Sequence, residues 1–267
     1  MNPIDRYNSC VDEINSLLCV GLDSDLTKLP QEFQTMSQPQ LAFNRYIINE
    51  THKYAAAYKL NLAFYESRGE SGITELKLTM DYLHKKHPEI FTICDAKRAD
   101  IGNTNAGYVT AFFDYFGFDA ITLHPYLGRE ALQPFLVRYD KVSIILCRTS
   151  NTGAGEFQDL ISNEKPLWQI VAEKVSSEWN ENQNCMLVVG ATYPAELKKV
   201  REITGDMTLL VPGIGAQGGD VKAAVEAGLN SEKKGMIINA ARSIIFAKDP
   251  GKEAKKLRDE INQYRNV

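Results

Sequence analysis

Short apolar runs rich in β-branched residues recur along the whole chain, with polar or turn-forming residues between them. We interpret eight of these runs as strands: residues 17–23, 56–62, 91–97, 120–124, 142–149, 185–191, 208–215 and 235–242. Each run is nearly continuously apolar rather than alternating, which is typical of strands that are covered on both faces. The pattern therefore favours a parallel sheet over an antiparallel one.

Segments with helical spacing of apolar residues separate most of these runs. They cover residues 40–52, 74–86, 103–116, 165–180, 195–203, 221–227 and 250–264. Repeated alternation of strand and helix predicts parallel pairing, and eight repeats predict an α/β fold of the (β/α)8 TIM barrel type. An open, doubly wound sheet is the structural alternative.

The polar stretches do not resemble linkers between domains. Residues 24–39, 150–164 and 230–234 each directly follow or precede a predicted strand, so we expect loops of one barrel domain over residues 1–267. A chain of 267 residues with 44% hydrophobic side chains would also suit two small domains, so composition alone does not decide.

Charge and cysteine content exclude several classes of protein. A net charge of −4 without any Lys/Arg run argues against a nucleic acid partner. No stretch approaches the roughly 20 apolar residues that span a membrane, and the first residues have no apolar signal core, so we expect a cytoplasmic protein. The five cysteines show no CxxC spacing, which indicates buried, reduced thiols.

Ionic residues interrupt the apolar runs where the predicted strands end. The first run ends at Asp23, the second contains Lys59 and Asn61, and the third ends with Asp95 and Lys97. In TIM barrels the carboxyl ends of the strands surround the active site, so these side chains are expected at one mouth of the barrel.

Side-chain alternation indicates which way these residues point. Asp95 and Lys97 share one side of their strand, as do Lys59 and Asn61, and this parity places both pairs inside the barrel. Asp100 follows on the turn into the next helix. The DxKxxD spacing alone would equally suit a solvated charge cluster at a strand end. Because buried lysines and carboxylates are costly to desolvate, the addition of Lys59 favours a functional site.

Glycines at the end of the seventh predicted strand suggest a phosphate site. Residues 211–220 contain several glycines, whose backbone N–H groups can approach an anion closely before a helix begins. Glycine loops are also common as simple turns. The position of this one, followed by Arg242 at the end of strand eight, matches the place where TIM barrels repeatedly bind phosphate.

A metal site is not predicted. His84 and His87 lie near the end of a lysine-rich helix and His124 closes the fourth strand, and none of them has a second cluster of ligands nearby in the sequence. We therefore expect neither a metal nor an organic cofactor.

Residues 95–104, Asp-Ala-Lys-Arg-Ala-Asp-Ile-Gly-Asn-Thr, resemble the signature of the orotidine 5′-phosphate decarboxylases. The remaining site segments of that family are similar to residues 21–23, 58–61, 149–151, 212–219 and 241–243, in the family's order. The resemblance covers almost the whole barrel. Asn61 and the long segment 150–164 are similar to the longer branch of the family.

The resemblance implies a homodimer that decarboxylates orotidine 5′-phosphate to UMP, the last step of de novo pyrimidine nucleotide synthesis. It implies a catalytic network of alternating charges formed by Lys59, Asp95, Lys97 and Asp100, with Lys97 as the proton donor. By the same resemblance Asp100 and Thr104 are supplied by the neighbouring subunit.

The resemblance also implies how the substrate is bound. Asp23 and Asn61 would hold ribose hydroxyls, and Ser150 would contact the amide edge of the pyrimidine. Gln217 and Arg242 would bind the phosphate.

Two other functions fit parts of the sequence. A sugar-phosphate lyase or decarboxylase of the same barrel group would use a similar charge motif with magnesium to stabilise an enediolate. A barrel without catalytic activity could sense a nucleotide phosphate through the glycine loop and Arg242. Lys59 together with Ser150 favours the pyrimidine substrate over that of the lyase, whereas the nucleotide sensor stays open as an alternative.

Overall fold

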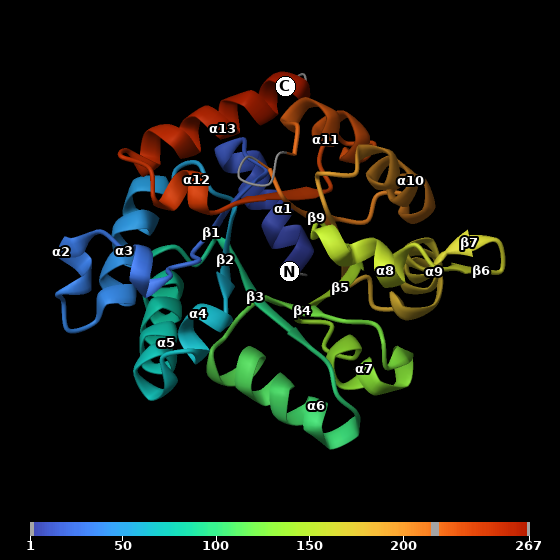
Figure 1. Ribbon diagram of the computed structural model, residues 1–267, viewed down its shortest axis with the longest axis horizontal. Helices are drawn as coiled ribbons and strands as arrows, with labels where there is room; N and C mark the ends of the chain where they lie inside the picture. The colour runs from blue at the N-terminus through green and yellow to red at the C-terminus, as the bar shows by residue number, and fades with distance from the viewer. Residues whose placement is uncertain (1–2, 215–218, 266–267) are drawn as a thin grey trace.

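Eight parallel strands form a closed barrel in the computed structural model, which describes residues 3–214 and 219–265 (Figure 1). The strands are β1 (Leu18–Gly21), β2 (Ala57–Asn61), β3 (Phe91–Arg98), β4 (Ala120–Leu123), β5 (Val142–Arg148), β8 (Cys185–Val189), β9 (Leu209–Pro212) and β10 (Met236–Ala240). The barrel closes where β1 pairs with β10, through Leu18 beside Ile238. All eight predicted strands and the predicted (β/α)8 fold are confirmed.

A ring of helices surrounds the strands (Figure 1). Its members are α3 (Pro39–Thr51), α5 (Gly69–Lys86), α6 (Gly102–Val109), α7 (Gly128–Leu136), α9 (Leu167–Lys174), α10 (Pro194–Thr204), α11 (Val221–Gly228) and α13 (Pro250–Arg265). Two π-helical stretches, Thr110–Tyr115 and Val175–Trp179, prolong α6 and α9. The seven predicted helices are therefore confirmed, although α9 begins at Leu167 and not at residue 165.

The sequence pattern did not predict α7. This helix is short and has Pro134 in its interior, a residue that lacks a backbone N–H and usually ends a helix. Packing compensates for the proline, since Leu132 and Phe135 of α7 are fully buried. Tertiary burial thus outweighs the local preference of the chain.

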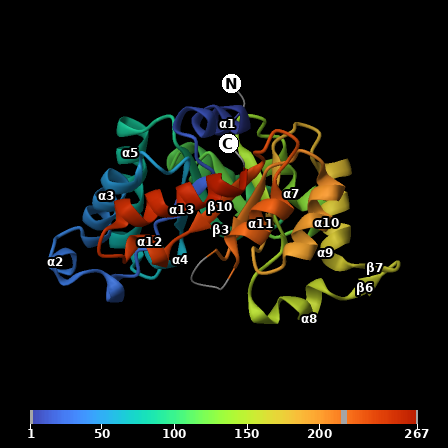
Figure 2. The same cartoon turned by 90° about the horizontal axis from the view of Figure 1, so that it is seen from above.

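The helix α1 (Pro3–Ile14) lies across the amino-terminal ends of the strands, at the end of the barrel opposite α8 (Figures 1 and 2). The Tyr7 hydroxyl donates a hydrogen bond of 2.6 Å to the carbonyl of Met236, and its ring packs edge-on against Phe91. Met236 and Phe91 are the first residues of β10 and β3. Arg6 pairs with Asp119, directly before β4. This helix therefore covers the amino-terminal mouth of the barrel.

The segments predicted as loops contain short elements. Residues 24–39 include a 3-10 turn (Leu26–Lys28) and α2 (Gln31–Gln34). Residues 150–164 include a 3-10 turn (Thr152–Ala154), α8 (Gly155–Gln158) and β6 (Ile161–Ser162), which pairs antiparallel with β7 (Lys165–Pro166) as a projecting hairpin (Figure 1). Two further short helices are α4 (Ala63–Glu66) and α12 (Arg242–Ile245). Each of these is shorter than the window in which periodicity can be detected.

The five cysteines are buried and unpaired, as predicted. Burial raises the pKa of the Cys10 thiol to about 11 and that of Cys147 to about 12, so both stay protonated near neutral pH. Within residues 3–214 and 219–265, no helix has the length and apolar character needed to cross a membrane.

Candidate active site

A cavity of about 450 Å³ opens at the carboxyl ends of the barrel strands. It brings together seven of the predicted site residues: Asp23, Lys59, Asn61, Asp95, Lys97, Ser150 and Arg242. These residues come from the ends of five strands that are distant in sequence. The predicted convergence of ionic side chains at one mouth of the barrel is therefore confirmed.

Two lysines and two aspartates alternate on the floor of this cavity. Lys59 Nζ lies 2.8 Å from Asp95 Oδ2 and 3.5 Å from Asp23 Oδ1, and Lys97 Nζ lies 2.5 Å from Asp95 Oδ1. Lys59 is almost fully buried, whereas half of the Lys97 side chain is exposed. The chain of charges runs Asp23, Lys59, Asp95, Lys97, so Asp23 is a member that the sequence analysis did not place in the network.

This alternation determines the charge states of the buried pair. Burial by itself would raise the pKa of the Asp95 carboxyl, but the ammonium groups of Lys59 and Lys97 hold it well below its ordinary value. Burial would likewise lower the pKa of Lys59, but Asp23 and Asp95 raise it above its ordinary value. Asp95 is therefore an anion and Lys59 a cation throughout the physiological range.

The backbone at Lys97 adopts an unusual conformation. Its φ angle is +48°, in the left-handed region that side chains with a Cβ seldom occupy. The register between β3 and β4 shifts between Cys94 and Arg98, as in a β-bulge. Bulges at barrel rims redirect side chains. The bulge at Lys97 thus aims its ammonium at Asp95 beside the cavity.

Thr122 on β4 holds this conformation, and the sequence analysis missed it. Its hydroxyl accepts a hydrogen bond of 3.0 Å from the Lys97 backbone N–H and donates one of 3.0 Å to Asp95 Oδ1. A signal was available, because Thr122 is a polar residue within an apolar strand. The acceptor role could not be foreseen, because it depends on the bulge in the neighbouring strand.

The segment carrying Ser150 is fixed by α8 and by β8. The Gln158 amide bonds to Thr149 twice, at 2.9 Å to its N–H and at 2.8 Å to its hydroxyl. A Cβ at Gly190 would lie 2.9 Å from the Cβ of Ser150, so the absence of a side chain there permits this close approach. Ser150 is therefore held at the rim of the cavity.

Another part of the cavity wall lies where the phosphate site was predicted. Gly213, Ile214 and Arg242 line it, and α11 begins soon afterwards with Asp220 capping the N–H of Ala223 at 2.7 Å. A Cβ at Gly21 would lie 2.7 Å from the Cβ of Ala241, next to Arg242. Gln217 lies outside the residues that the structure describes.

Asp100 and Thr104 do not line the cavity of their own chain. Asp100 Oδ1 accepts a hydrogen bond of 2.7 Å from the next backbone N–H, at the start of α6, and Thr104 is exposed. Asp100 also forms no ion pair with any residue that the structure describes. Within one chain the network therefore ends at Lys97, and Asp23 lies at its other end, beside Lys59.

None of the four histidines lines the cavity. His84 Nε2 contacts the carbonyl of Gly117 at 3.1 Å, and His87 packs against His52 with 4.6 Å between ring centroids. In the described part of the chain, no group of three or more His, Cys, Asp or Glu side chains is arranged to hold a metal ion.

Comparisons with known proteins match the whole barrel. Residues 16–257 match the model of the orotidine 5′-phosphate decarboxylase / HUMPS family. An orotidine 5′-phosphate decarboxylase of Cellvibrio japonicus is 41% identical over 272 aligned positions, covering 100% of this chain and 99% of that protein.

Solved structures agree with this match. The structure of Leishmania donovani OMP decarboxylase superimposes with a TM-score of 0.91 at 38% identity, covering 100% of both chains. The structure of Leishmania donovani UMP synthase also superimposes with a TM-score of 0.91. The identity is 40%, and the match covers 99% of this chain and 57% of that one. The fold, the cavity and these similarities together show that the chain belongs to the orotidine 5′-phosphate decarboxylase / HUMPS family.

Proposed function

We propose that this protein is a carboxy-lyase that converts orotidine 5′-phosphate to UMP and carbon dioxide, as the last step of de novo pyrimidine nucleotide synthesis in the cytoplasm. We further propose that one barrel domain over residues 1–267 carries the activity. The observation that supports this most directly is the ammonium of Lys97, held 2.5 Å from Asp95 and half exposed to the cavity. Lys59, Asp95, Lys97 and Asp100 are the proposed catalytic residues.

The chemistry of the substrate explains why an ammonium is needed. Loss of carbon dioxide from carbon 6 of the pyrimidine leaves a carbanion in the plane of the ring, with no adjacent group to accept the electron pair. Without a cofactor, the protein must stabilise this charge electrostatically. Lys97 would attract the developing carbanion and then transfer a proton to carbon 6. Asp95 and Thr122 would keep its ammonium in place throughout.

Repulsion of the substrate carboxylate by Asp95 is a smaller contribution. Two unit charges about 4 Å apart at an effective dielectric constant near 20 interact by about 4 kcal/mol. That energy corresponds to roughly three decades of rate at most. Stabilisation of the carbanion by the preorganised ammonium is therefore the principal contribution in this proposal.

The rest of the cavity suits a nucleotide monophosphate. Asp23 Oδ1 is buried and faces the Lys59 ammonium at 3.5 Å, too far for a strong hydrogen bond, so it could also accept one from a ribose hydroxyl. We assign Asp23 and Asn61 to the ribose, and Ser150 to the amide edge of the pyrimidine. Arg242 and Gln217 would bind the phosphate, whose binding energy can be used to close loops over the ring.

A spectrophotometric assay with orotidine 5′-phosphate tests the function. We expect the pyrimidine absorbance to change as UMP forms, and we expect the same rate after exhaustive treatment with EDTA. Binding of UMP without turnover of orotidine 5′-phosphate would favour the nucleotide sensor. Loss of turnover after chelation, restored by magnesium, would favour the metal-dependent lyase.

We also propose that the protein is a homodimer in which Asp100 and Thr104 complete the partner's site. Two observations support the proposal. Both residues lie at the barrel rim, at the start of α6, and neither lines the cavity of its own chain. In a closed two-fold dimer, each subunit would then supply these residues to the other.

Mixing two inactive variants tests this arrangement. A dimer of one Lys97→Ala subunit and one Asp100→Asn subunit has both defects in one site and neither in the other. Random exchange makes about half of the dimers hybrids, so activity should return to about a quarter of wild type. If no activity returns after mass spectrometry confirms exchange, Asp100 acts within its own subunit.

A further inference from the structure

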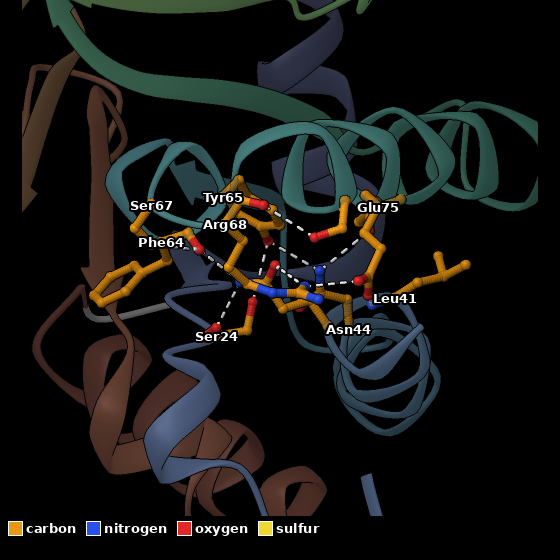
Figure 3. A network of polar contacts seen from close by, with 11 residues as sticks. Ser24, Leu41, Asn44, Phe64, Tyr65, Ser67, Arg68 and Glu75 are labelled. Carbon is orange, nitrogen blue, oxygen red and sulfur yellow. Dashed lines mark hydrogen bonds and ion pairs between the residues drawn. The ribbon is translucent and has the colours of Figure 1, made fainter. Parts of the chain in front are cut away.

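A buried polar network lies behind the cavity, where α3, α4 and α5 meet the loop that follows β1 (Figure 3). Arg68 and Glu75 form its ion pair, with 2.6 Å between Nη1 and Oε1. Gln40, Asn44, Tyr65 and Ser24 are fully buried within it. None of these residues lines the cavity. Any effect of these residues on the site must therefore pass through the backbone.

Gln40 bridges two backbone segments that carry proposed site residues. Its Nε2 donates one hydrogen bond of 2.8 Å to the carbonyl of Ser24 and another of 2.8 Å to the carbonyl of Phe64. Ser24 follows Asp23, and Phe64 lies in α4, which Asn61 introduces by accepting a hydrogen bond from Ala63 N–H at 3.2 Å. One side-chain amide thus joins the loop of Asp23 to the helix that follows Asn61.

The remaining contacts of Gln40 restrict its orientation. Arg68 Nη1 donates to Gln40 Oε1 at 2.7 Å, and the same guanidinium is held by Glu75. Glu75 in turn accepts a hydrogen bond of 2.8 Å from the backbone N–H of Leu41, beside Gln40. Because the oxygen of the amide is bound to a cation, its NH2 group must face the two carbonyls.

Tyr65 holds the other side of Asp23. Its hydroxyl donates to the carbonyl of Leu22 at 3.2 Å, and it accepts a hydrogen bond of 2.9 Å from Asn44 Nδ2. The residues immediately before and after Asp23 are therefore both bound through their carbonyl oxygens. Figure 3 shows Ser24, Asn44 and Tyr65 gathered around this loop.

Burying such a network costs more desolvation free energy than packing the helices through apolar side chains. Apolar side chains of similar volume would bury this space without the desolvation of a guanidinium, a carboxylate and two amides. The two N–H donors of Gln40 bind the loop after Asp23 and the first turn of α4, next to Asn61. We propose that Gln40 is a positioning residue, which fixes Asp23 relative to Asn61 and so sets how the ribose hydroxyls are held.

This inference rests on the proposed function, because it takes Asp23 and Asn61 as ribose ligands. It makes a prediction that a simple packing role does not. If Gln40 acts through the ribose contacts, its removal should harm a substrate that has both hydroxyls and should hardly affect a substrate that lacks the hydroxyl concerned.

The experiment compares Gln40→Met with wild type on orotidine 5′-phosphate and on its 2′-deoxy and 3′-deoxy analogues. We expect Gln40→Met to lower kcat/KM for the full substrate by about tenfold, and for at least one analogue by less than about threefold. Equal losses on all three substrates would overturn the inference. If the wild-type protein fails to turn over orotidine 5′-phosphate, the proposed function fails instead.

A matched control separates positioning from general stability. Asn184 is a fully buried amide at the opposite end of the barrel, and its Nδ2 donates to the carbonyls of Leu136, Arg138 and Lys141. Asn184→Leu should lower stability without changing the preference between the three substrates. If Gln40→Met does not fold, Tyr65→Phe replaces it in the same comparison. An equal loss on all three substrates in Tyr65→Phe would overturn the inference just as well.

Discussion

Both ends of the barrel hold cations, but these cations have different partners. At the carboxyl ends of the strands, Lys59 and Lys97 share the carboxylate of Asp95, and Lys97 remains half exposed to the cavity. At the amino ends, Arg201 donates five hydrogen bonds of 2.5 to 2.9 Å to the carbonyls of Gly205, Met207, Gly228 and Gly235. Lys59 and Lys97 thus pair charge with charge, whereas Arg201 binds its charge to the backbone.

This difference determines which of the cations can still donate a hydrogen bond to a ligand. The guanidinium of Arg201 has all of its N–H groups occupied, so it can only hold the ends of β9 and β10 in place. Burial lowers its pKa to about 10, and the nearby carboxylate of Asp206 only partly offsets this effect. The lysines at the other end are held by a few contacts to ionised groups. Lys97 therefore keeps donor capacity for a ligand.

The largest expected effect is that of Lys97→Ala. We predict a loss in kcat of at least about a thousandfold, because the variant lacks the ammonium that stabilises the carbanion. Binding of UMP, measured by calorimetry, should largely survive, since the ammonium is needed mainly as the charge develops. Turnover close to that of wild type would remove Lys97 from the mechanism.

Arg242→Ala should have the next largest effect, through the phosphate alone. We expect kcat/KM for orotidine 5′-phosphate to fall by about 100-fold, as charge-assisted hydrogen bonds to the dianion are lost. Turnover of the nucleoside orotidine, which lacks the phosphate, should change far less. Similar losses on both substrates would place Arg242 in a different role.

Arg201→Met tests the role of the cation at the amino-terminal end of the barrel. We predict a decrease of about 2 kcal/mol in the free energy of unfolding, measured by urea denaturation, because several backbone carbonyls lose their donor. The folded variant should keep its kcat within about twofold of wild type. A large loss of kcat in the folded variant would show that the two ends are coupled and would break the comparison.

Thr122→Val is expected to have the smallest effect in free energy, a change of about 1.4 kcal/mol in the activation barrier. The variant keeps the shape of the side chain but loses the hydroxyl that joins Asp95 to the Lys97 backbone, so we expect kcat to fall by about tenfold. Thr122→Ser should restore most of the loss, because it restores the hydroxyl. If Thr122→Val and Thr122→Ser are equally impaired, packing of the methyl group matters instead of the hydrogen bonds.

The barrel could be predicted from the sequence because its strands are buried on both faces and contrast sharply with the loops. Elements whose stability comes from tertiary contacts were missed. The helix α1 depends on contacts of Tyr7 with Met236 and Phe91, and α7 forms in spite of Pro134. Both helices nevertheless carry apolar residues at helical spacing, so a local signal was present and was overlooked.

For the candidate active site, the charged residues could be predicted from the sequence, but their contacts with one another could not. Ionic residues at strand ends, such as Lys59 and Asp95, stand out because charge is rare in buried strands. The pairing of Asp23 with Lys59 could not be predicted, since it depends on the alignment of β1 with β2. The support given by Gln40 was also hidden, because a single glutamine within a helix has no distinguishing pattern.

The left-handed backbone of Lys97 determines when the strain at this residue arises. A residue with a Cβ in that region raises the free energy of the folded protein by about 1 to 2 kcal/mol. The folded chain carries this strain before any substrate arrives, since the bulge of β3 and the hydroxyl of Thr122 maintain it. The strain free energy therefore arises once, when the chain folds. Every later turnover then begins with the ammonium already in place.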